Sequence, residues 1–269
     1  MTITSTKIPN LDVPVDIRRE HSALVITMHD PATRNAVGEV LFQKGREALE
    51  EVRHDTSIRS VILAGAGGTF CSGGNLSMLT TLRQQPQERT QAAFESFHGF
   101  IKAIRSAPVP VIAAVEGDAA GAGFSMALAC DFIIASETAR FTMAYVQVGL
   151  TPDGGGSWFL TRSLPHALAS RLVILGEPIW ARELDRYGLI RQMVPEGEVT
   201  EAARTFAMLI ALGPRCAMER GKKLLQAAAN NVLNTQMDLE AQNFGEALHH
   251  PESIEGIRAF MEKRPPRYT

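Results

Sequence analysis

Two short apolar segments constrain the fold of this chain more than any other feature of its sequence. Ser60–Ala64 and Val111–Val115 are each followed by a glycine-rich loop, at Gly65–Asn75 and Gly117–Gly123, and then by a helical pattern. Strands of about five residues without polar alternation are typical of parallel sheets that helices cover on both faces. The recurrence of strand, loop and helix therefore predicts an α/β fold.

A β-hairpin is expected before these segments and a helical region after them. Val15–Arg18 and Leu24–Met28 are β-rich runs with a polar turn between them, and apolar residues recur at helical spacing along Val37–His54. A second amphipathic helix presents one apolar face, formed by Ala93, Phe94, Phe97, Ile101 and Ile104. Two further strands are expected at Phe132–Ala135 and Arg140–Thr142.

After Pro195 the pattern becomes helical throughout. The predicted helices are Val199–Leu212, Arg215–Ala229, Thr235–Leu248 and Ser253–Lys263. This change of pattern predicts a core domain over residues 1–205 and a C-terminal helical region over residues 206–269.

Composition and charge narrow the classes of partner. The chain is 45% hydrophobic and 21% charged, with a formal net charge of -2 and a pI near 6.4, so it offers no general basic surface to a nucleic acid. No segment approaches the roughly 20 apolar residues of a membrane span. Cys71, Cys130 and Cys216 lack metal-ligand spacing, and Met1–Asn10 lacks the apolar core of a signal peptide. We expect a cytoplasmic protein without disulfides, a metal site, a nucleic-acid partner or a membrane anchor.

Glycine clusters are the main candidates for chemistry, because the chain lacks a Walker loop, an HExxH metal motif and a GxSxG nucleophile elbow. The clusters are Gly65–Gly74, Gly117–Gly123 and Gly149–Gly156. Glycines also serve turns and close packing. Two of the clusters, however, follow buried strands and precede helices, so each can direct free backbone N–H groups toward a common point. That arrangement suits the oxyanion of a thioester enolate, for which each donor is worth about 3 kcal/mol.

Two motifs carry a family resemblance. Gly67–Leu76, which reads GGTFCSGGNL, resembles the FCAGADL-type signature of the crotonase (enoyl-CoA hydratase/isomerase) superfamily, and Pro110–Asp131, PVIAAVEGDAAGAGFSMALACD, is similar to its second signature. GLTPDGGGSW at Gly149–Trp158 and FMEKRPPRY at Phe260–Tyr268 extend the resemblance. It implies a spiral of ββα repeats, a C-terminal helical trimerisation region and an acyl-CoA thioester substrate. It also implies a homotrimer, or a hexamer built from two trimers.

The resemblance assigns the two oxyanion donors to the backbone amides of Gly74 and Ala122. The two catalytic glutamates of the family's hydratases fall on Ser125 and Tyr145, and neither side chain is a ready base near neutral pH. Asp153 stands where several family isomerases carry a single Asp or Glu. One carboxylate can remove a proton from one carbon and return it to another, so we predict an isomerase with Asp153 as proton shuttle. The structural alternative for Asp153 is an N-cap of the helix that follows.

Three alternatives to isomerisation stay open. Overall similarity favours an enoyl-CoA hydratase, although both glutamates are missing. His98, Tyr145 and Asp153 resemble the triad of 4-chlorobenzoyl-CoA dehalogenase, in which the Asp attacks the aromatic ring, although Gly74 replaces the bulky aromatic at the first donor. The third alternative is a non-catalytic protein that binds acyl-CoA or a macromolecular partner. Ser125, Tyr145 and His98 are expected to line the substrate pocket.

Coenzyme A is expected as part of the substrate, with no separate cofactor. The resemblance implies contacts from Arg34 and Ala36, in the tripeptide Arg34-Asn35-Ala36, and from the first signature, through Ser72, Gly73, Asn75 and Leu76. Asn75 replaces the acidic residue that usually follows the first donor. Lys263 resembles the family lysine that reaches the coenzyme from a neighbouring subunit, with Phe260 packed nearby. A solvated surface charge is the alternative for Arg34 and Lys263.

Overall fold

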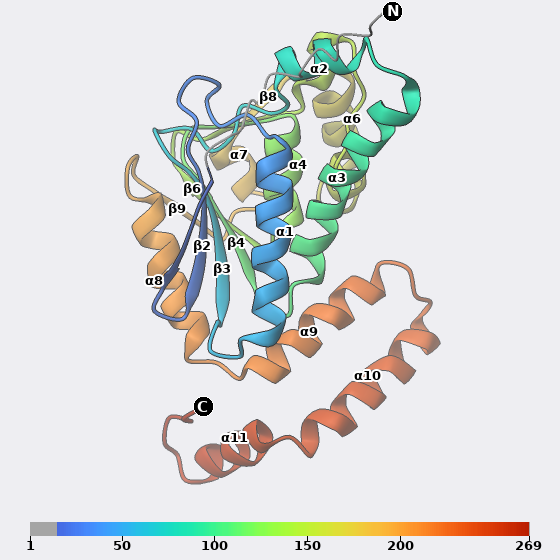
Figure 1. The fold of residues 1–269 in the computed structure, drawn as a ribbon. Helices are drawn as coiled ribbons and strands as arrows, with labels where there is room; N and C mark the ends of the chain where they lie inside the picture. Colours follow the sequence, from blue (N-terminus) through green and yellow to red (C-terminus); the bar gives the residue numbers. More distant parts are fainter. Residues whose placement is uncertain (1–14, 269) are drawn as a thin grey trace, which may run out of the picture.

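A six-stranded sheet lies at the centre of the computed structural model, which describes residues 15–268 (Figure 1). Its order is β1-β2-β3-β4-β6-β9, with β1 antiparallel to β2 and every later pair parallel. The strands are β1 Val15–Glu20, β2 Ala23–Met28, β3 Ser60–Gly65, β4 Val111–Val115, β6 Phe132–Ser136 and β9 Gln192–Val194. The predicted hairpin and buried parallel strands are confirmed. Residues 1–10, on which the expected absence of a signal peptide depended, lie outside the described part.

Alternate side chains of this sheet belong to two separate cores. In β3, Val61 and Leu63 pack into the core that includes α1 (Glu39–His54) and α3 (Gln87–Ser106), whereas Ile62 packs with α8 (Val199–Ala211). Figure 1 shows α1 and α8 on opposite sides of the sheet. Because helices cover both faces, successive residues of a strand are all buried, which explains the uninterrupted apolar runs in the sequence.

A second sheet lies next to the glycine-rich segments. Its order is β5-β7-β8, and the bounds of these strands are Asp118–Ala120, Arg140–Thr142 and Pro178–Trp180. The helix α4 (Ala122–Ala129) follows β5 directly, and all of its residues are buried. A Cβ atom on Gly123 would lie 2.7 Å from the Cys71 side chain, so a glycine is needed for α4 to approach the first glycine-rich loop.

Several short helices lacked a clear signal in the sequence. They are α2 Leu76–Leu82, the 3-10 helix η1 Ala144–Val148, α5 Gly156–Ser163, α6 His166–Leu175 and α7 Ala181–Asp185. In α2, the Asn75 side chain accepts a hydrogen bond from the Met78 amide at 3.1 Å and so acts as the N-cap. The segment Leu76–Glu95 therefore contains a capped helix and the start of α3.

The C-terminal helices α9 (Arg215–Ala228), α10 (Leu233–Leu248) and α11 (Pro251–Met261) extend away from the sheets (Figure 1). Residue 205 lies inside α8, which packs on the large sheet on both sides of that position through Ala203 and Ala207. The first C-terminal helix, α9, is still attached to the body through the Lys222–Asp131 ion pair at 2.6 Å, and α10 and α11 project beyond it. Large apolar side chains on these helices face solvent in the single chain, and Leu225, Phe244 and Phe260 are more than 70% exposed.

Candidate functional site

The two glycine-rich segments meet in a short parallel pairing. Cys71 pairs with Ala119, through hydrogen bonds from the Cys71 amide to the Asp118 carbonyl at 3.0 Å and from the Ala120 amide to the Cys71 carbonyl at 2.9 Å. Gly74 and Ala122 each lie three residues beyond this pair on their own segment, so the pairing carries the two segments forward side by side.

Gly73 marks how closely the segments approach. A Cβ atom at Gly73 would lie 2.9 Å from the Ala120 carbonyl oxygen and 3.7 Å from the Ala122 nitrogen, and the φ of Gly73 is 104°. Both the space and the backbone angle require glycine at this position. The structure thus brings together the two amides that the sequence singled out, those of Gly74 and Ala122.

Both amides are free of the backbone ladder. Ala122 is the first residue of α4, so its N–H has no acceptor inside the helix. Over residues 15–268, neither the Gly74 nor the Ala122 amide donates a hydrogen bond to another element. The N-terminal end of the α4 dipole adds partial positive charge at Ala122. The pair can therefore accept an oxyanion.

The loop before α1 is attached to the first glycine-rich segment by main-chain contacts. The Val37 amide donates to the Gly73 carbonyl at 2.8 Å, and the Ser72 amide donates to the Arg34 carbonyl at 3.0 Å. Ala36, expected at the coenzyme, is buried next to these two hydrogen bonds. Of the other residues expected there, Leu76 is exposed at the start of α2.

Asn35 is a structural residue that the sequence reasoning missed. Its side-chain amide donates to the carbonyls of Ala66 and Thr69 at 2.8 and 2.7 Å, and its side-chain oxygen accepts from the Asp30 amide at 2.8 Å. The residue is 1% exposed and its φ is 60°. The sequence signal for this role was a polar residue that tolerates positive φ, Asn35, directly before the apolar Ala36 and Val37.

Arg34 lies at the surface near the glycine segments, but it is not an unpaired cation. It forms an ion pair with Asp118, which also pairs with Arg140 at 2.8 Å. Burial tends to raise the pKa of Asp118, but hydrogen bonds from Arg140 and Arg34 outweigh burial and hold the pKa below its usual value. The group of two guanidinium ions and one carboxylate leaves a net positive charge.

Asp153, Tyr145 and Ser125 form one hydrogen-bonded group. The Tyr145 hydroxyl donates to Oδ1 of Asp153 at 2.7 Å, the Ser125 hydroxyl donates to the Asp153 carbonyl at 2.9 Å, and the two hydroxyl oxygens are 3.1 Å apart. Ser125 lies in the first turn of α4, which begins at Ala122. A Cβ on Gly121 would lie 3.9 Å from the Tyr145 ring. The carboxylate is thus held beside the helix that supplies one of the free amides.

The environment of Asp153 raises its pKa above the usual value, mainly because the carboxyl is removed from water. The hydrogen bond from Tyr145 and the charge of His98 act in the opposite direction. His98 is half-buried on α3 and acts on Asp153 through its electrostatic effect, whereas Ser125 and Tyr145 contact Asp153 directly. Burial also raises the pKa of the Tyr145 hydroxyl, which stays protonated.

The capping alternative for Asp153 is wrong. The N-cap of α5 is Gly155, which has a φ of 80°, and no side chain caps this helix. Asp153 contributes only its carbonyl, which accepts from the Gly156 amide at 3.1 Å. Its carboxylate therefore does not cap the helix, and it accepts the hydrogen bond from Tyr145.

Phe260 and Lys263 lie far from this group within one chain. Phe260 lies in the last turn of α11, in the projecting C-terminal region (Figure 1), and is highly exposed, and Lys263 lies two residues beyond the end of this helix. The structure of a single chain therefore does not bring these two residues to the amides or to Asp153.

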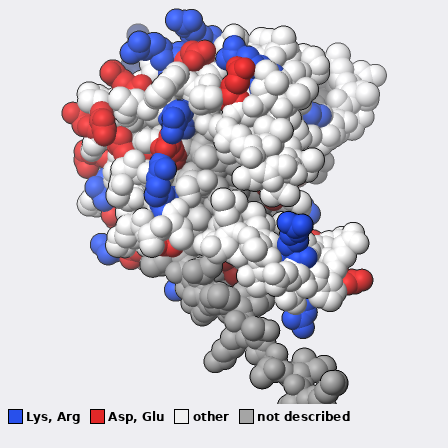
Figure 2. All heavy atoms as spheres, turned by 90° about the horizontal axis from the view of Figure 1, so that it is seen from above, with Lys and Arg blue, Asp and Glu red and all other residues white. Residues whose placement is uncertain are grey.

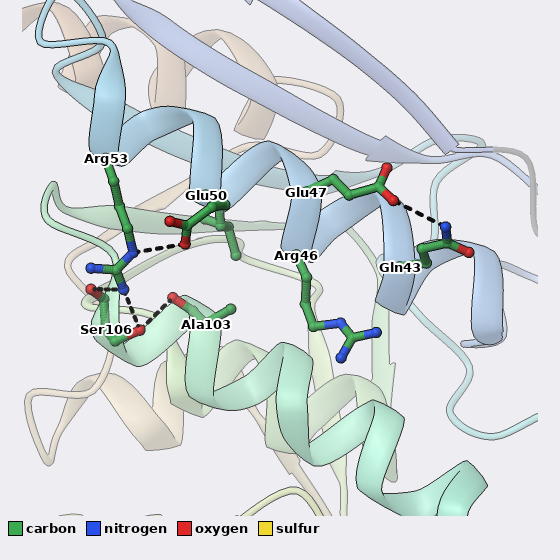
Figure 3. Close-up of a pocket in the computed structure, with 8 residues that line it drawn as sticks. Gln43, Arg46, Glu47, Glu50, Arg53, Ala103 and Ser106 are labelled. Atoms are coloured by element: carbon green, nitrogen blue, oxygen red, sulfur yellow. Dashed lines mark hydrogen bonds and ion pairs between the residues drawn. The ribbon is translucent and has the colours of Figure 1, made fainter.

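A cavity of about 400 Å³ between α1 and α3 lies away from the predicted residues (Figure 3). Arg53 pairs there with Glu50 at 3.0 Å and donates to the Ser106 carbonyl at 2.9 Å, and Gln43 donates to Glu47 at 3.0 Å. None of the predicted site residues lines it. Its polar groups mainly bind one another.

Cys216, His250 and Glu252 form another cluster that sequence spacing does not reveal. Their potential ligand atoms lie within 4.8 Å of one another. The Glu252 carboxylate accepts from the Cys216 amide at 2.9 Å, and the Glu252 amide donates to Nδ1 of His250 at 3.3 Å. These bonds close the N-terminal ends of α9 and α11, which is a structural role.

The surface near α2 and α6 carries mixed charges. Figure 2 views the molecule from this end and shows basic and acidic side chains intermixed along one side, beside a broad area with neither. Exposed apolar side chains on η1 and α6 include Val148, Ile174 and Leu175. Among the described residues, no helix is both long and apolar enough to cross a membrane.

Comparison with known proteins gives consistent matches over nearly the whole chain. The model of a family described as "Enoyl-CoA hydratase/isomerase" matches residues 18–269. A probable enoyl-CoA hydratase of Rhodobacter capsulatus is 37% identical, over 91% of this chain and 93% of that protein. A 1,2-epoxyphenylacetyl-CoA isomerase of Escherichia coli K12 is 33% identical, over 93% of this chain and 96% of that protein.

Solved structures agree with these matches. The crystal structure of an enoyl-CoA hydratase from Polaromonas sp. JS666 is similar with a TM-score of 0.93 and 43% identity, and the match covers 95% of this chain and 99% of that one. The α/β fold with a C-terminal helical region that the resemblance implied is therefore confirmed.

Proposed function

This chain belongs to the enoyl-CoA hydratase/isomerase family, and from that premise we propose that it is an acyl-CoA isomerase that moves a double bond through a thioester enolate. The observation that carries the proposal is a half-buried carboxylate, Asp153, held by hydrogen bonds next to α4, whose first amide is free. At the two positions where hydratases of the family carry glutamate, this chain has Ser125 and Tyr145.

In the proposed reaction, the thioester oxygen accepts hydrogen bonds from the Gly74 and Ala122 amides. The carboxylate of Asp153 removes a proton from the α-carbon of a 3-enoyl thioester, and the electron pair passes into a dienolate whose charge lies on the thioester oxygen. Asp153 then returns the proton to the γ-carbon, which leaves the double bond conjugated with the carbonyl. Each amide stabilises the enolate by about 3 kcal/mol in comparable sites.

The chemistry of Ser125 and Tyr145 supports isomerisation over hydration. Ser125 is fully buried, and its hydroxyl is used by the Asp153 carbonyl. Burial raises the pKa of Tyr145, so this hydroxyl does not take a proton from water near neutral pH. A second base for activating water is therefore lacking in the proposed site, whereas a one-base shuttle needs only Asp153.

A dehalogenase-like reaction is a second candidate, and the Tyr145–Asp153 hydrogen bond together with the charge of His98 favours it. In that reaction the carboxylate would attack an activated aryl carbon and displace halide. Release of halide from a 4-halobenzoyl-CoA would distinguish it from isomerisation. A binding-only role would gain if no acyl-CoA were converted at all.

Coenzyme A and subunit assembly complete the proposal. We assign contacts with the coenzyme to Arg34 and Ala36 and to the first signature, through Ser72, Gly73, Asn75 and Leu76. The exposed apolar side chains of α9–α11 support a trimer or a hexamer, in which Phe260 and Lys263 would reach a neighbouring subunit's coenzyme. No separate cofactor is needed for this chemistry. The free thiols of all three cysteines support a reducing, cytoplasmic location.

The test uses the ultraviolet absorbance of the conjugated thioester that forms from a 3-enoyl-CoA. Asp153→Asn is expected to lower kcat by at least about 100-fold, the usual contribution of a general base. Asp185→Asn is the matched control, because Asp185 is exposed at the end of α7. The 1,2-epoxyphenylacetyl-CoA substrate named for the Escherichia coli relative belongs in the same panel. Full activity of Asp153→Asn, or rapid hydration of crotonyl-CoA by the unaltered protein, would contradict the proposal.

A further inference from the structure

We propose that Tyr145 is a positioning residue for Asp153: it binds Oδ1 and so reserves Oδ2 as the one oxygen that carries the proton between the two carbons. This inference rests on the proposed isomerase function and adds a residue whose role there is not proton transfer. The comparisons with relatives do not assign it.

The donor count determines the direction of each bond in the group. An ionised carboxylate only accepts hydrogen bonds, so the Tyr145 hydroxyl is the donor in its 2.7 Å contact with Oδ1. The Ser125 hydroxyl has one hydrogen to donate, and it donates it in the 2.9 Å hydrogen bond to the Asp153 carbonyl. Tyr145 therefore directs the carboxyl group, while Ser125 holds the backbone of the same residue.

Tyr145 and Ser125 act from different elements. Tyr145 comes from η1 and Ser125 from α4, whereas Asp153 lies in the loop between η1 and α5. Ser125 is buried, and the Asp153 carbonyl also accepts from the Gly156 amide at 3.1 Å. The main chain of Asp153 is thus anchored twice, which leaves rotation of its side chain as the freedom that Tyr145 removes.

Proton transfer keeps this contact intact. When Oδ2 receives the substrate proton, Oδ1 becomes the carbonyl oxygen of a carboxylic acid and still accepts the Tyr145 hydrogen bond. The bond is stronger to the carboxylate than to the neutral acid, so Tyr145 favours the ionised form. The other titratable group that bears on Asp153 is His98 from α3, while α4 contributes the neutral Ser125.

The kinetic test is Tyr145→Phe, which removes only the hydroxyl. Loss of a hydrogen bond to a charged group is expected to lower kcat about ten- to a hundredfold, with little change in KM, because the aromatic ring remains. The acid limb of the pH–rate profile is expected to move to higher pH, since a base that loses a donor binds its proton more tightly. Tyr187→Phe is the matched control, because Tyr187 is exposed just after α7 and its amide donates to the Leu184 carbonyl, outside the Asp153 group.

A second measurement does not depend on turnover. The change in unfolding free energy caused by Asp153→Asn is measured across pH in the unaltered protein and in the Tyr145→Phe protein. At neutral pH the gain in stability from Asp153→Asn is expected to be larger in Tyr145→Phe, because the half-buried carboxylate has lost its donor. Equal gains in the two backgrounds would overturn the inference.

The two measurements separate the possible failures. Coupling between Tyr145 and Asp153 without any isomerase turnover would remove the proposed function but keep Tyr145 as the residue that positions the carboxylate. Isomerase turnover that depends on Asp153, with an unchanged kcat and pH profile in Tyr145→Phe, would keep the function and overturn the inference.

Discussion

Replacing Asn35 by Ala tests whether the site depends on a buried clamp outside the catalytic group. The Asn35 side chain joins its loop to the first glycine-rich segment through two donated bonds of 2.7 and 2.8 Å, and it closes the loop itself by accepting from the Asp30 amide at 2.8 Å. Ala would leave the carbonyls of Ala66 and Thr69 and the amide of Asp30 without these partners. The backbone would also keep a positive φ, which Ala adopts less readily than Asn.

The expected cost follows from these contacts. One buried and two part-buried backbone groups lose their partners, at about 1 kcal/mol each, the low end of the usual range, and the positive φ adds roughly 1 kcal/mol. We therefore expect Asn35→Ala to lower the free energy of unfolding by about 4 kcal/mol, a large share of a typical domain's stability. Because the clamped segment leads to Gly74, kcat should fall as well.

Urea unfolding at one protein concentration measures this loss, with circular dichroism as the probe. Asn230→Ala is the matched control, because Asn230 is exposed and makes only a backbone hydrogen bond. A loss below about 1 kcal/mol, no larger than a typical exposed substitution, would show that water or a shifted loop replaces the clamp. The reasoning about Asn35 would then be wrong.

Three further changes test other parts of the structure. Asp153→Asn should raise the melting temperature at neutral pH. The folded pKa of this carboxyl lies above its unfolded value, so its stabilising contribution is complete below the unfolded pKa and is lost as pH rises through the folded pKa. In melting curves from pH 4.5 to 8, the melting temperature of Asp153→Asn should exceed that of the unaltered protein by less and less toward low pH. Lys222→Met should lower the free energy of unfolding by about 3 kcal/mol, because the half-buried Asp131 loses its cationic partner at 2.6 Å and is left with the hydrogen bond from the Val111 amide. A change under 1 kcal/mol by urea unfolding would rule this out. Gly123→Val should abolish turnover and lower the melting temperature, because its Cβ would meet Cys71 at 2.7 Å; normal kcat in this variant would contradict the packing of α4.

Local patterns in the sequence were sufficient for most of the fold. The apolar runs at β3 and β4 are buried on both faces, so the composition of each strand records its environment without reference to distant residues. The helical period likewise identified α1, α3 and the C-terminal helices. It did not show that α8 packs on the sheet across residue 205 while α9–α11 extend outward, because an amphipathic pattern does not say which surface an apolar face contacts.

The candidate site divides in the same way. Gly74 and Ala122 could be singled out from the sequence because backbone amides after a strand and before a helix depend on local chain geometry. The tertiary structure alone decided that the Asp153 carboxylate accepts a hydrogen bond from Tyr145 rather than capping α5, and that its pKa is raised. It also decided that the Asn35 side chain binds the Ala66 carbonyl and that Asp118 pairs with Arg34. Hydrogen-bond partners and burial depend on residues that are distant in the sequence, and only the folded chain brings them together.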